Sequence, residues 1–284
     1  MAEKDRPPGR GKVIELPGSP LPDIRIAATC GQGNKIPGSR NDIWNCPAYG
    51  EHQQQLMLYV KIGMTHRAIM VEMLAAQIAQ VIGLPTPDPF LVTVKPSHVG
   101  QVGAKPLIAF GTLNPSTRGM ARPARDLDML FSLLEQLKLS DLACAFDEWI
   151  ANDVRSDRDI LICPESRLYL IDHEAAMPEG LDPGAAVTNW IAMRLMERLP
   201  DNGRLQLLNR LRARLAAFRR VSLEGPPRAA GFMQDGGLIF QQLAAFLVER
   251  LEQLDRLLSQ RILPEQLYLN PRSDTGHKDE AEQA

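Results

Sequence analysis

Short apolar runs that alternate with polar residues dominate the first third of the chain and predict β-strands. Four such stretches lie at residues 23–29 (DIRIAAT), 56–62 (LMLYVKI), 89–94 (PFLVTV) and 106–113 (PLIAFGTL). Turn-forming residues separate them, as in residues 31–41 (GQGNKIPGSRN). Residues 65–83 (THRAIMVEMLAAQIAQVIG) have a helical period instead, with Thr65 as the predicted N-cap and Gly83 placed to end the helix.

From Ala124 onward the hydrophobic pattern is mostly helical, with amphipathic stretches at residues 188–199, 204–218 and 239–262. Residues 159–172 (DILICPESRLYLID) are the exception and predict two short strands joined by a Pro-Glu-Ser turn. The pattern predicts an α+β protein with two lobes. A small β-rich N-lobe with one helix covers residues 24–114, and a larger, mainly helical C-lobe covers residues 115–270. The polar ends, residues 1–23 and 271–284, predict a flexible arm and a disordered tail.

Composition narrows the class of protein. The 284 residues are 44% hydrophobic and 23% charged, as in a soluble globular protein. No apolar run is long enough for a transmembrane helix and the N-terminus lacks a secretory signal, so we expect a cytoplasmic protein without a membrane partner. A net charge of −2 argues against direct nucleic-acid binding but leaves room for a local basic phosphate pocket. The four widely spaced cysteines suggest reduced thiols: Cys30, Cys46, Cys144 and Cys163.

Two charged residues interrupt apolar patterns. Lys61 lies within the apolar strand LMLYVKI, and Glu72 lies eleven residues later in the apolar face of the predicted helix. A buried Lys or Glu is costly alone and tolerable as an ion pair, so the two positions predict a pair. The alternative is that each side chain points to solvent at the edge of its element.

The residues around this pair resemble the N-lobe of HipA-like kinases. The matching features are YVKI, the Glu helix, a Gly-Leu-Pro-x-Pro turn and the strand PFLVTV, in that order. Residues 146–177 (FDEWIANDVRSDRDILICPESRLYLIDHEAAM) resemble the catalytic loop, hairpin and metal motif of the same family. The resemblance covers roughly residues 36–177 in its motifs. It implies a bilobal protein-kinase-like fold that binds ATP and Mg²⁺ in the cleft between the lobes.

The resemblance also assigns roles on the nucleotide side of the site. Lys61 would bind phosphate and Glu72 would orient it. Gly38 and Ser39 match a short turn that covers the phosphates, where backbone N–H groups suit an anion. The turn Gly31-Gln-Gly33 is a weaker rival for that role. The backbone hinge that meets adenine would come from residues of the FGTL segment, namely Phe110, Gly111 and Leu113.

The catalytic loop departs from the family pattern at one position. Arg155 matches the Arg that follows the catalytic Asp, which puts Val154 at the position of that Asp. A Val side chain can neither accept a proton nor orient a hydroxyl by hydrogen bonding. Asp153 or Asp157 would have to stand in through a shift of the loop, and we take Asp153 as the candidate base. Arg155 itself is either a catalytic residue or a structural one paired with a nearby carboxylate.

The metal motif is better preserved. Asp172 matches the metal-binding Asp, and Asp159 replaces the metal-binding Asn. Carboxylate oxygens suit Mg²⁺, so Asp159 and Asp172 are the predicted metal ligands. His173 is interpreted as a structural residue that orients the loop, because metal-binding histidines usually occur in clusters. Asp147 is either a brace for the loop or a site residue.

These residues predict a kinase that transfers phosphate from ATP to a Ser or Thr hydroxyl of a protein. The first alternative is a pseudokinase that binds nucleotide and acts as an interaction module, which Val154 favours. The second is a small-molecule or lipid kinase, since type II phosphatidylinositol kinases look similar in the catalytic loop. The third is an α/β binding protein unrelated to kinases. The arginine-rich helix at residues 204–220 is interpreted as a solvated cationic face, with docking of an acidic partner as the alternative.

Overall fold

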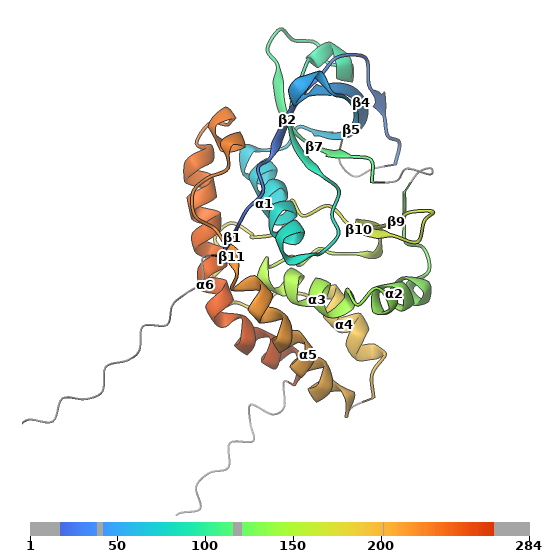
Figure 1. Ribbon diagram of the computed structural model, residues 1–284, viewed down its shortest axis with the longest axis vertical. Coiled ribbons are helices and arrows are strands. Elements are labelled where there is room, and N and C mark those ends of the chain that lie inside the picture. The colour runs from blue at the N-terminus through green and yellow to red at the C-terminus, as the bar shows by residue number, and fades with distance from the viewer. Residues whose placement is uncertain (1–17, 39–41, 116–120, 201, 264–284) are drawn as a thin grey trace, which may run out of the picture.

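The computed structural model describes residues 18–38, 42–115, 121–200 and 202–263. It is a mixed α+β structure with the sheet at one end and most helices at the other (Figure 1). The strands are β1 (Ser19–Pro20), β2 (Arg25–Thr29), β3 (Asn34–Lys35), β4 (Asp42–Gly50), β5 (Gln55–Ile62), β6 (Pro89–Val94), β7 (Leu107–Leu113), β8 (Arg122–Pro123), β9 (Ile160–Ile162), β10 (Leu168–Leu170) and β11 (Val221–Ser222). The α-helices are α1 (His66–Ile82), α2 (Leu127–Gln136), α3 (Ser140–Trp149), α4 (Trp190–Glu197), α5 (Gly203–Phe218) and α6 (Gly236–Ile262).

The main sheet closes on itself. Its strand order is β2-β6-β7-β5-β4-β3, and β2 also pairs with β4, so that five of the strands form a small barrel. Alternate side chains point inward and fill the interior with apolar residues such as Leu58, Val60 and Val92. The four predicted strands of this region are confirmed as β2, β5, β6 and β7. Strand β4 was not predicted, because Asn45 and Pro47 interrupt its apolar pattern.

Helix α1 lies between the barrel and the remaining helices (Figure 1). It begins as predicted after Thr65, whose hydroxyl accepts a hydrogen bond from the N–H of Ala68 at 3.1 Å. It ends at Gly83, which adopts the left-handed conformation with φ +79°. Every residue from Ile69 to Ala79 is buried, since the barrel covers one side of α1 and α6 contacts another. Helix α1 is therefore held firmly enough to present a charged side chain inside the protein.

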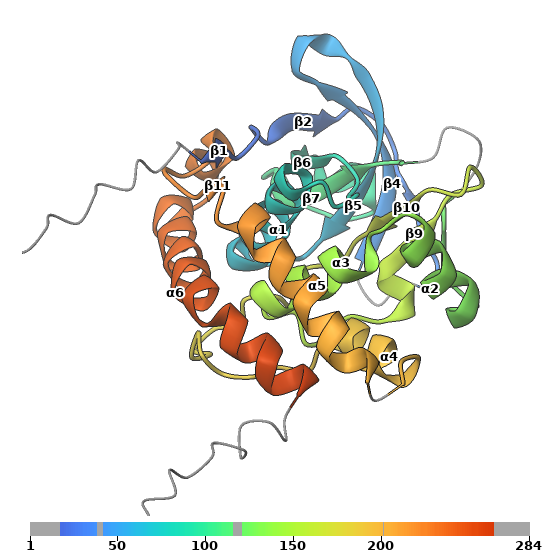
Figure 2. The ribbon, with the colours of Figure 1, turned by 60° about the horizontal axis from the view of Figure 1, so that its bottom comes forward.

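The helices of the second half share a large core with α1. Helix α3 packs against α4, α5 and α6, and α6 runs along one side of the molecule (Figure 2). Trp149 at the end of α3 stacks on Phe218 of α5 with ring centroids 4.9 Å apart, and its indole N–H donates to the carbonyl of Leu247. The three predicted amphipathic stretches are confirmed as α4, α5 and α6. This core fixes the end of α3, where the candidate catalytic loop begins.

The predicted hairpin at residues 159–172 is confirmed. Strands β9 and β10 pair antiparallel, with Ile160 opposite Leu170. The hairpin lies beneath the barrel (Figure 1), and the N–H of Leu170 donates to the carbonyl of Pro85 just after α1. The hairpin thereby brings residues 171–174 under the end of β5.

The described part of the predicted N-terminal arm differs from the prediction. Residues 18–23 belong to the predicted flexible arm, yet β1 pairs in parallel with β11. The N–H of Ser19 donates to the carbonyl of Arg220 at 2.6 Å, and the amide of Gln77 donates to the carbonyl of Pro22. Residues 1–17 and the predicted tail, residues 271–284, lie outside the described residues. Among the described helices, none is both long and apolar enough to cross a membrane.

Candidate active site

A buried ion pair joins the barrel to α1. Lys61 is the penultimate residue of β5 and its ammonium group binds the carboxylate of Glu72, two turns into α1. Glu72 is 1% exposed and Lys61 is 9% exposed. The pairing inferred from the two interrupted apolar patterns is therefore present, and neither side chain points to solvent.

The surroundings of the pair keep both groups charged. Burial on its own would lower the pKa of Lys61, but the carboxylates of Glu72, Asp172 and Glu174 outweigh it and raise the pKa above its usual value. Burial would likewise raise the pKa of Glu72, yet Lys61 and His173 lower it to about 2. An ammonium and a carboxylate therefore persist in the interior at neutral pH.

Asp172 approaches Lys61 from the opposite side. Its Oδ1 lies 2.6 Å from the Lys61 Nζ, although the two residues are 111 positions apart in the sequence. Asp172 follows β10 in the left-handed conformation, with φ +61°, which is uncommon for a residue other than glycine. The next backbone N–H, that of His173, donates to Glu72 Oε2 at 3.0 Å. Glu72 thus positions both Lys61 and the segment that carries Asp172.

His173 packs behind Glu72 and helps to hold the loop that carries Asp172. It is 1% exposed and its ring stands edge-on to Phe146 at a centroid distance of 5.8 Å. Its Nδ1 lies 3.5 Å from Glu72 Oε2. These contacts fit the structural interpretation, in which His173 orients the loop.

Glu174 is a site residue that the sequence reasoning missed. Its Oε2 lies 3.4 Å from the Lys61 Nζ. Carboxylate oxygens of Glu72, Asp172 and Glu174 all lie within 4.8 Å of one another. All three carboxylates surround the Lys61 ammonium, and the two partly exposed ones, Asp172 and Glu174, offer the hard oxygen donors that a divalent cation such as Mg²⁺ prefers. The only signal in the sequence was an acidic residue two positions after Asp172.

Asp159, the other predicted metal ligand, lies outside that group. Its Oδ2 accepts hydrogen bonds from the backbone N–H and the hydroxyl of Ser156, at 2.8 and 2.9 Å. Burial raises the pKa of Asp159, with the bonds from Ser156 acting in the opposite direction. The negative charge of Asp172 also contributes to this rise, so the two carboxylates interact electrostatically. Asp159 caps its own turn, and its second oxygen has no hydrogen bond among those that the described residues make.

Arg155 is a brace inside the loop. Its Nε and Nη2 bind the two oxygens of Asp147, both at 2.9 Å, and its Nη1 donates to the carbonyl of Ile171 at 2.6 Å. Arg155 is 4% exposed and Asp147 is fully buried. Burial would lower the pKa of Arg155, but the Asp147 carboxylate raises it. Arg155 therefore ties α3 to the residue before Asp172, which is a positioning role, and Asp147 braces the loop.

The position at which the sequence predicts the catalytic base is open to solvent. Val154 is 49% exposed, and Asp153 beside it is also exposed. The loop is anchored on either side by buried residues, since Asn152 and Arg155 both bind Asp147. The loop therefore has a fixed frame, but neither Asp153 nor Val154 makes a side-chain hydrogen bond or ion pair with another described residue. The Asp153 carboxylate is open to solvent, and the frame does not orient it.

The turn predicted to cover the phosphates follows β3 at one end of the barrel. Gly38 lies in the turn between β3 and β4 with φ +76°, and Ser39 lies outside the described residues. The start of β4 runs beside the end of β5, where Ile43 pairs with Lys61, so the turn extends from the Lys61 end of the barrel.

The residues of the predicted hinge lie mostly inside the sheet. Phe110 and Gly111 belong to β7, which pairs with β5 on one side and β6 on the other. Phe110 is the ladder partner of Lys61, so their side chains share a face of the sheet. A Cβ at Gly111 would meet Val92 Cγ2 at 2.6 Å, which explains the glycine by packing. Leu113 is the last residue of β7, and its N–H donates to the backbone carbonyl of Asp88.

This geometry agrees with the comparisons to known proteins. A family model described as HipA-like kinase matches residues 43–219, which is more than half of the chain. The matched segment contains Lys61, Glu72, Asp172 and the loop around Arg155. The chain belongs to the HipA-like kinase family.

Solved structures support the fold. The crystal structure of the Helicobacter pylori proinflammatory kinase CtkA matches with a TM-score of 0.50 and 14% sequence identity, covering 84% of this chain and 98% of that one. At this identity the likeness concerns the fold alone. The crystal structure of Cex1p matches with a TM-score of 0.25 and 10% identity, over 89% of this chain and 42% of that one, and carries no argument. No curated protein matches the chain.

Proposed function

We propose that this protein is a bilobal kinase, with residues 24–114 as N-lobe and 115–270 as C-lobe, that binds Mg-ATP between them. It would transfer the γ-phosphoryl group to a Ser or Thr hydroxyl of a protein. One observation carries the proposal. The Lys61 ammonium lies between the buried Glu72 and Asp172, so an amine from the barrel and a carboxylate from the β10 loop converge on one point. Phosphoryl transfer depends on this kind of positioned charge.

The roles of the residues follow from their contacts. Lys61, held by Glu72, would bind phosphate oxygens. Asp172 and Glu174 would hold Mg²⁺, which when bound neutralises charge on the transferring phosphoryl group. Asp159 would contribute through its electrostatic link to Asp172. In the transfer, the substrate oxygen would bond to the γ-phosphorus as the bond to the β–γ bridging oxygen breaks and ADP leaves, with the hydroxyl proton passing to Asp153 or to water.

A second candidate is a nucleotide-binding module without transferase activity. Val154 favours it, because this position carries the catalytic Asp in the family pattern and Asp153 is not held in its place. Phosphatidylinositol as acceptor is a further alternative that the assay below includes. Membership of the HipA-like family argues against the remaining alternative, an α/β binding protein unrelated to kinases.

Mg-ATP is expected to raise the melting temperature of the full chain by several degrees at about 100 times its dissociation constant. Asp172→Asn should remove most of this shift, because it takes away a charged ligand next to Lys61. Glu179→Gln, in the same loop and exposed, is the matched control and should melt like the wild type. Equal shifts in the wild type and Asp172→Asn would contradict the proposed binding site.

The same preparations separate the candidate functions. Radiolabelled ATP is incubated with a Ser/Thr protein mixture and with phosphatidylinositol vesicles. Label on protein supports the kinase, a melting shift without any transfer supports the nucleotide-binding module, and label on lipid alone rejects the protein acceptor.

Substitutions at Glu174 and Asp159 can show which of these two carboxylates binds the metal. Glu174→Gln should weaken Mg²⁺ binding about tenfold, because the affinity of a carboxylate site depends on its number of charged ligands. Mg²⁺ would be titrated by calorimetry in the presence of a saturating non-hydrolysable ATP analogue, with Glu179→Gln as control. Asp159→Asn should have a smaller effect, since Ser156 already binds one oxygen of that carboxylate. A larger loss of Mg²⁺ affinity in Asp159→Asn than in Glu174→Gln would show that Asp159, and not Glu174, is the metal ligand beside Asp172.

A further inference from the structure

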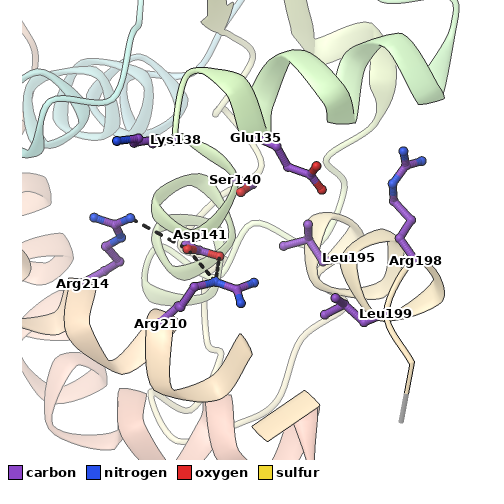
Figure 3. A pocket seen from close by; sticks show the side chains of 9 residues that line it. All are labelled: Glu135, Lys138, Ser140, Asp141, Leu195, Arg198, Leu199, Arg210 and Arg214. Atoms are coloured by element: carbon purple, nitrogen blue, oxygen red, sulfur yellow. Dashed lines mark hydrogen bonds and ion pairs between the residues drawn. The ribbon is translucent and has the colours of Figure 1, made fainter. Parts of the chain in front are cut away.

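A hollow of about 370 Å³ lies on the helical half of the protein. It opens between the start of α3, the end of α4 and α5 (Figure 3). Neither Lys61, Glu72 nor Asp172 lines it. The charged residues that line it are four cations and two carboxylates: Lys138, Arg198, Arg210, Arg214, Glu135 and Asp141. The lining therefore carries an excess of two positive charges.

One carboxylate of the lining is already neutralised by its neighbours. Asp141 is 7% exposed and accepts from Arg210 Nε at 3.1 and 3.3 Å. Arg214 Nη2 lies 3.8 Å from the same carboxylate. Because Asp141 holds Arg210 through Nε, the two terminal nitrogens of that guanidinium point past it toward Leu195 and Leu199 (Figure 3). Asp141 thus fixes a cationic fork that faces the hollow.

A second arginine stands on the other rim. Arg198, just after α4, lies across the hollow from Arg210 and above Leu199 (Figure 3). Its Nη1 binds Asp128 at 2.6 Å, but the side chain of Asp128 is 87% exposed. A pair exposed to this degree contributes little and exchanges with a competing anion at small cost. Arg198 is therefore available to a ligand.

The other walls of the hollow are the first turn of α3 and two leucines. Ser140, the first residue of α3, lines the hollow, and the residue before it, Leu139, provides no side-chain cap for the helix. The N–H groups of this first turn add partial positive charge at the same end of the hollow. Leu195 and Leu199 form an apolar wall opposite. A polar group with several acceptor oxygens and a carbon substituent fits both walls.

We propose that this hollow binds a phosphate monoester. A tetrahedral dianion matches the excess of two positive charges and accepts hydrogen bonds from several directions at once, whereas a planar carboxylate engages one fork. The Arg210 fork, Arg198 and the Ser140 hydroxyl donate to the phosphate oxygens, and the leucine wall contacts the ester carbon. The ester is either a free small molecule or a phosphorylated side chain. The site is separate from the proposed ATP site and does not depend on it.

Calorimetric titration of the full chain, in a buffer free of phosphate, tests the proposal. The probes are inorganic phosphate, O-phosphoserine and a phosphoserine peptide. Arg210→Gln and Arg198→Gln are each expected to weaken binding about tenfold, the loss of one charge-assisted hydrogen bond. Glu135→Gln is expected to tighten binding, since it removes a negative charge from the rim. Arg198 pairs with the exposed Asp128 and lies over the Phe131 ring, contacts that hold no buried charge, so Arg198→Gln keeps the test valid if Arg210→Gln impairs folding.

Two controls locate the binding. Arg212→Gln removes an equivalent exposed ion pair, with Asp255, from α5 outside the hollow and should bind like the wild type. Asp172→Asn should also leave binding unchanged. Similar affinity for O-phosphoserine and peptide supports a small phosphate ester as ligand, and at least tenfold tighter binding of the peptide supports a phosphorylated protein. The proposal is overturned by absent binding, by equal losses in Arg212→Gln and Arg198→Gln, or by a change confined to Asp172→Asn.

Discussion

Replacing Val154 by Asp is expected to raise the rate of phosphoryl transfer to a protein acceptor by about 10²- to 10⁴-fold, the usual contribution of a positioned base. The reason lies in the loop frame. Asn152 and Arg155 bind Asp147 on either side of the missing residue, so the backbone at position 154 is already held. Val154 is half exposed, and a carboxylate there pays little desolvation. The measurement is the initial rate with radiolabelled ATP and a fixed acceptor.

Two further variants test whether a faster rate comes from a proton-accepting carboxylate at position 154. Val154→Asn has a similar size and can orient a hydroxyl, but it cannot accept a proton, so its rate should stay near that of the wild type. Asp153→Ala in the wild type should lower any residual transfer if Asp153 serves as the base. A Val154→Asp chain that transfers no faster than Val154→Asn would show that the missing carboxylate does not limit the reaction.

The sequence predicted the parts of this site that interrupt a local pattern. A Lys in an apolar strand and a Glu in an apolar helix face stood out because burial is costly for each, and their pairing followed. Thr65 and Gly83 likewise marked the ends of α1 through the local chemistry of capping. The strand and helix classes of the two halves could be read for the same reason, since periodicity is local.

Features that depend on long-range pairing could not be read in this way. The register of β7 between β5 and β6 places Phe110 and Gly111 inside the sheet, and no local pattern encodes that register. The distance between Lys61 and Glu174 depends on how the β10 loop folds under β5. Strand β4 contains polar residues and a proline, and its pairing with β5, β2 and β3 makes it a strand. The closure of the barrel through β2 and β4 is of the same kind.

Replacing Lys61 by Met is expected to destabilise the protein by about 3–5 kcal/mol at neutral pH, because it leaves the carboxylate of Glu72 buried without its cation. The double variant Lys61→Met/Glu72→Gln should recover most of this loss. Its Gln carbonyl still accepts from the N–H of His173, which donates to Glu72 at 3.0 Å in the wild type. Asp172 and Glu174 are partly exposed and can turn to solvent. Free energies of unfolding from urea titrations measure both effects.

The pH dependence of the free energy of unfolding separates this electrostatic effect from a packing defect, because a packing defect would not change with pH. In the wild type the pKa of Glu72 is lowered from 4.5 to about 2, so its contribution is complete above pH 4.5 and is lost as the pH falls toward 2. A shift of this size corresponds to roughly 3 kcal/mol. The pKa of Lys61 is raised, so its contribution is complete below 10.5 and is lost only at higher pH. Neutral pH therefore lies inside the window in which both contributions are complete.

Without Lys61 the buried Glu72 carboxyl should have a pKa above its usual value, since burial, the largest influence, is then opposed by His173 alone. The free energy of unfolding of Lys61→Met should consequently rise as the pH falls from 7 to 5, while that of the wild type stays level. Lys61→Met/Glu72→Gln has no carboxyl at position 72 and should lack this rise. Parallel curves for Lys61→Met and the double variant would mean that Glu72 is not the charge that Lys61 compensates. In that case the electrostatic basis of the proposed nucleotide site would be wrong.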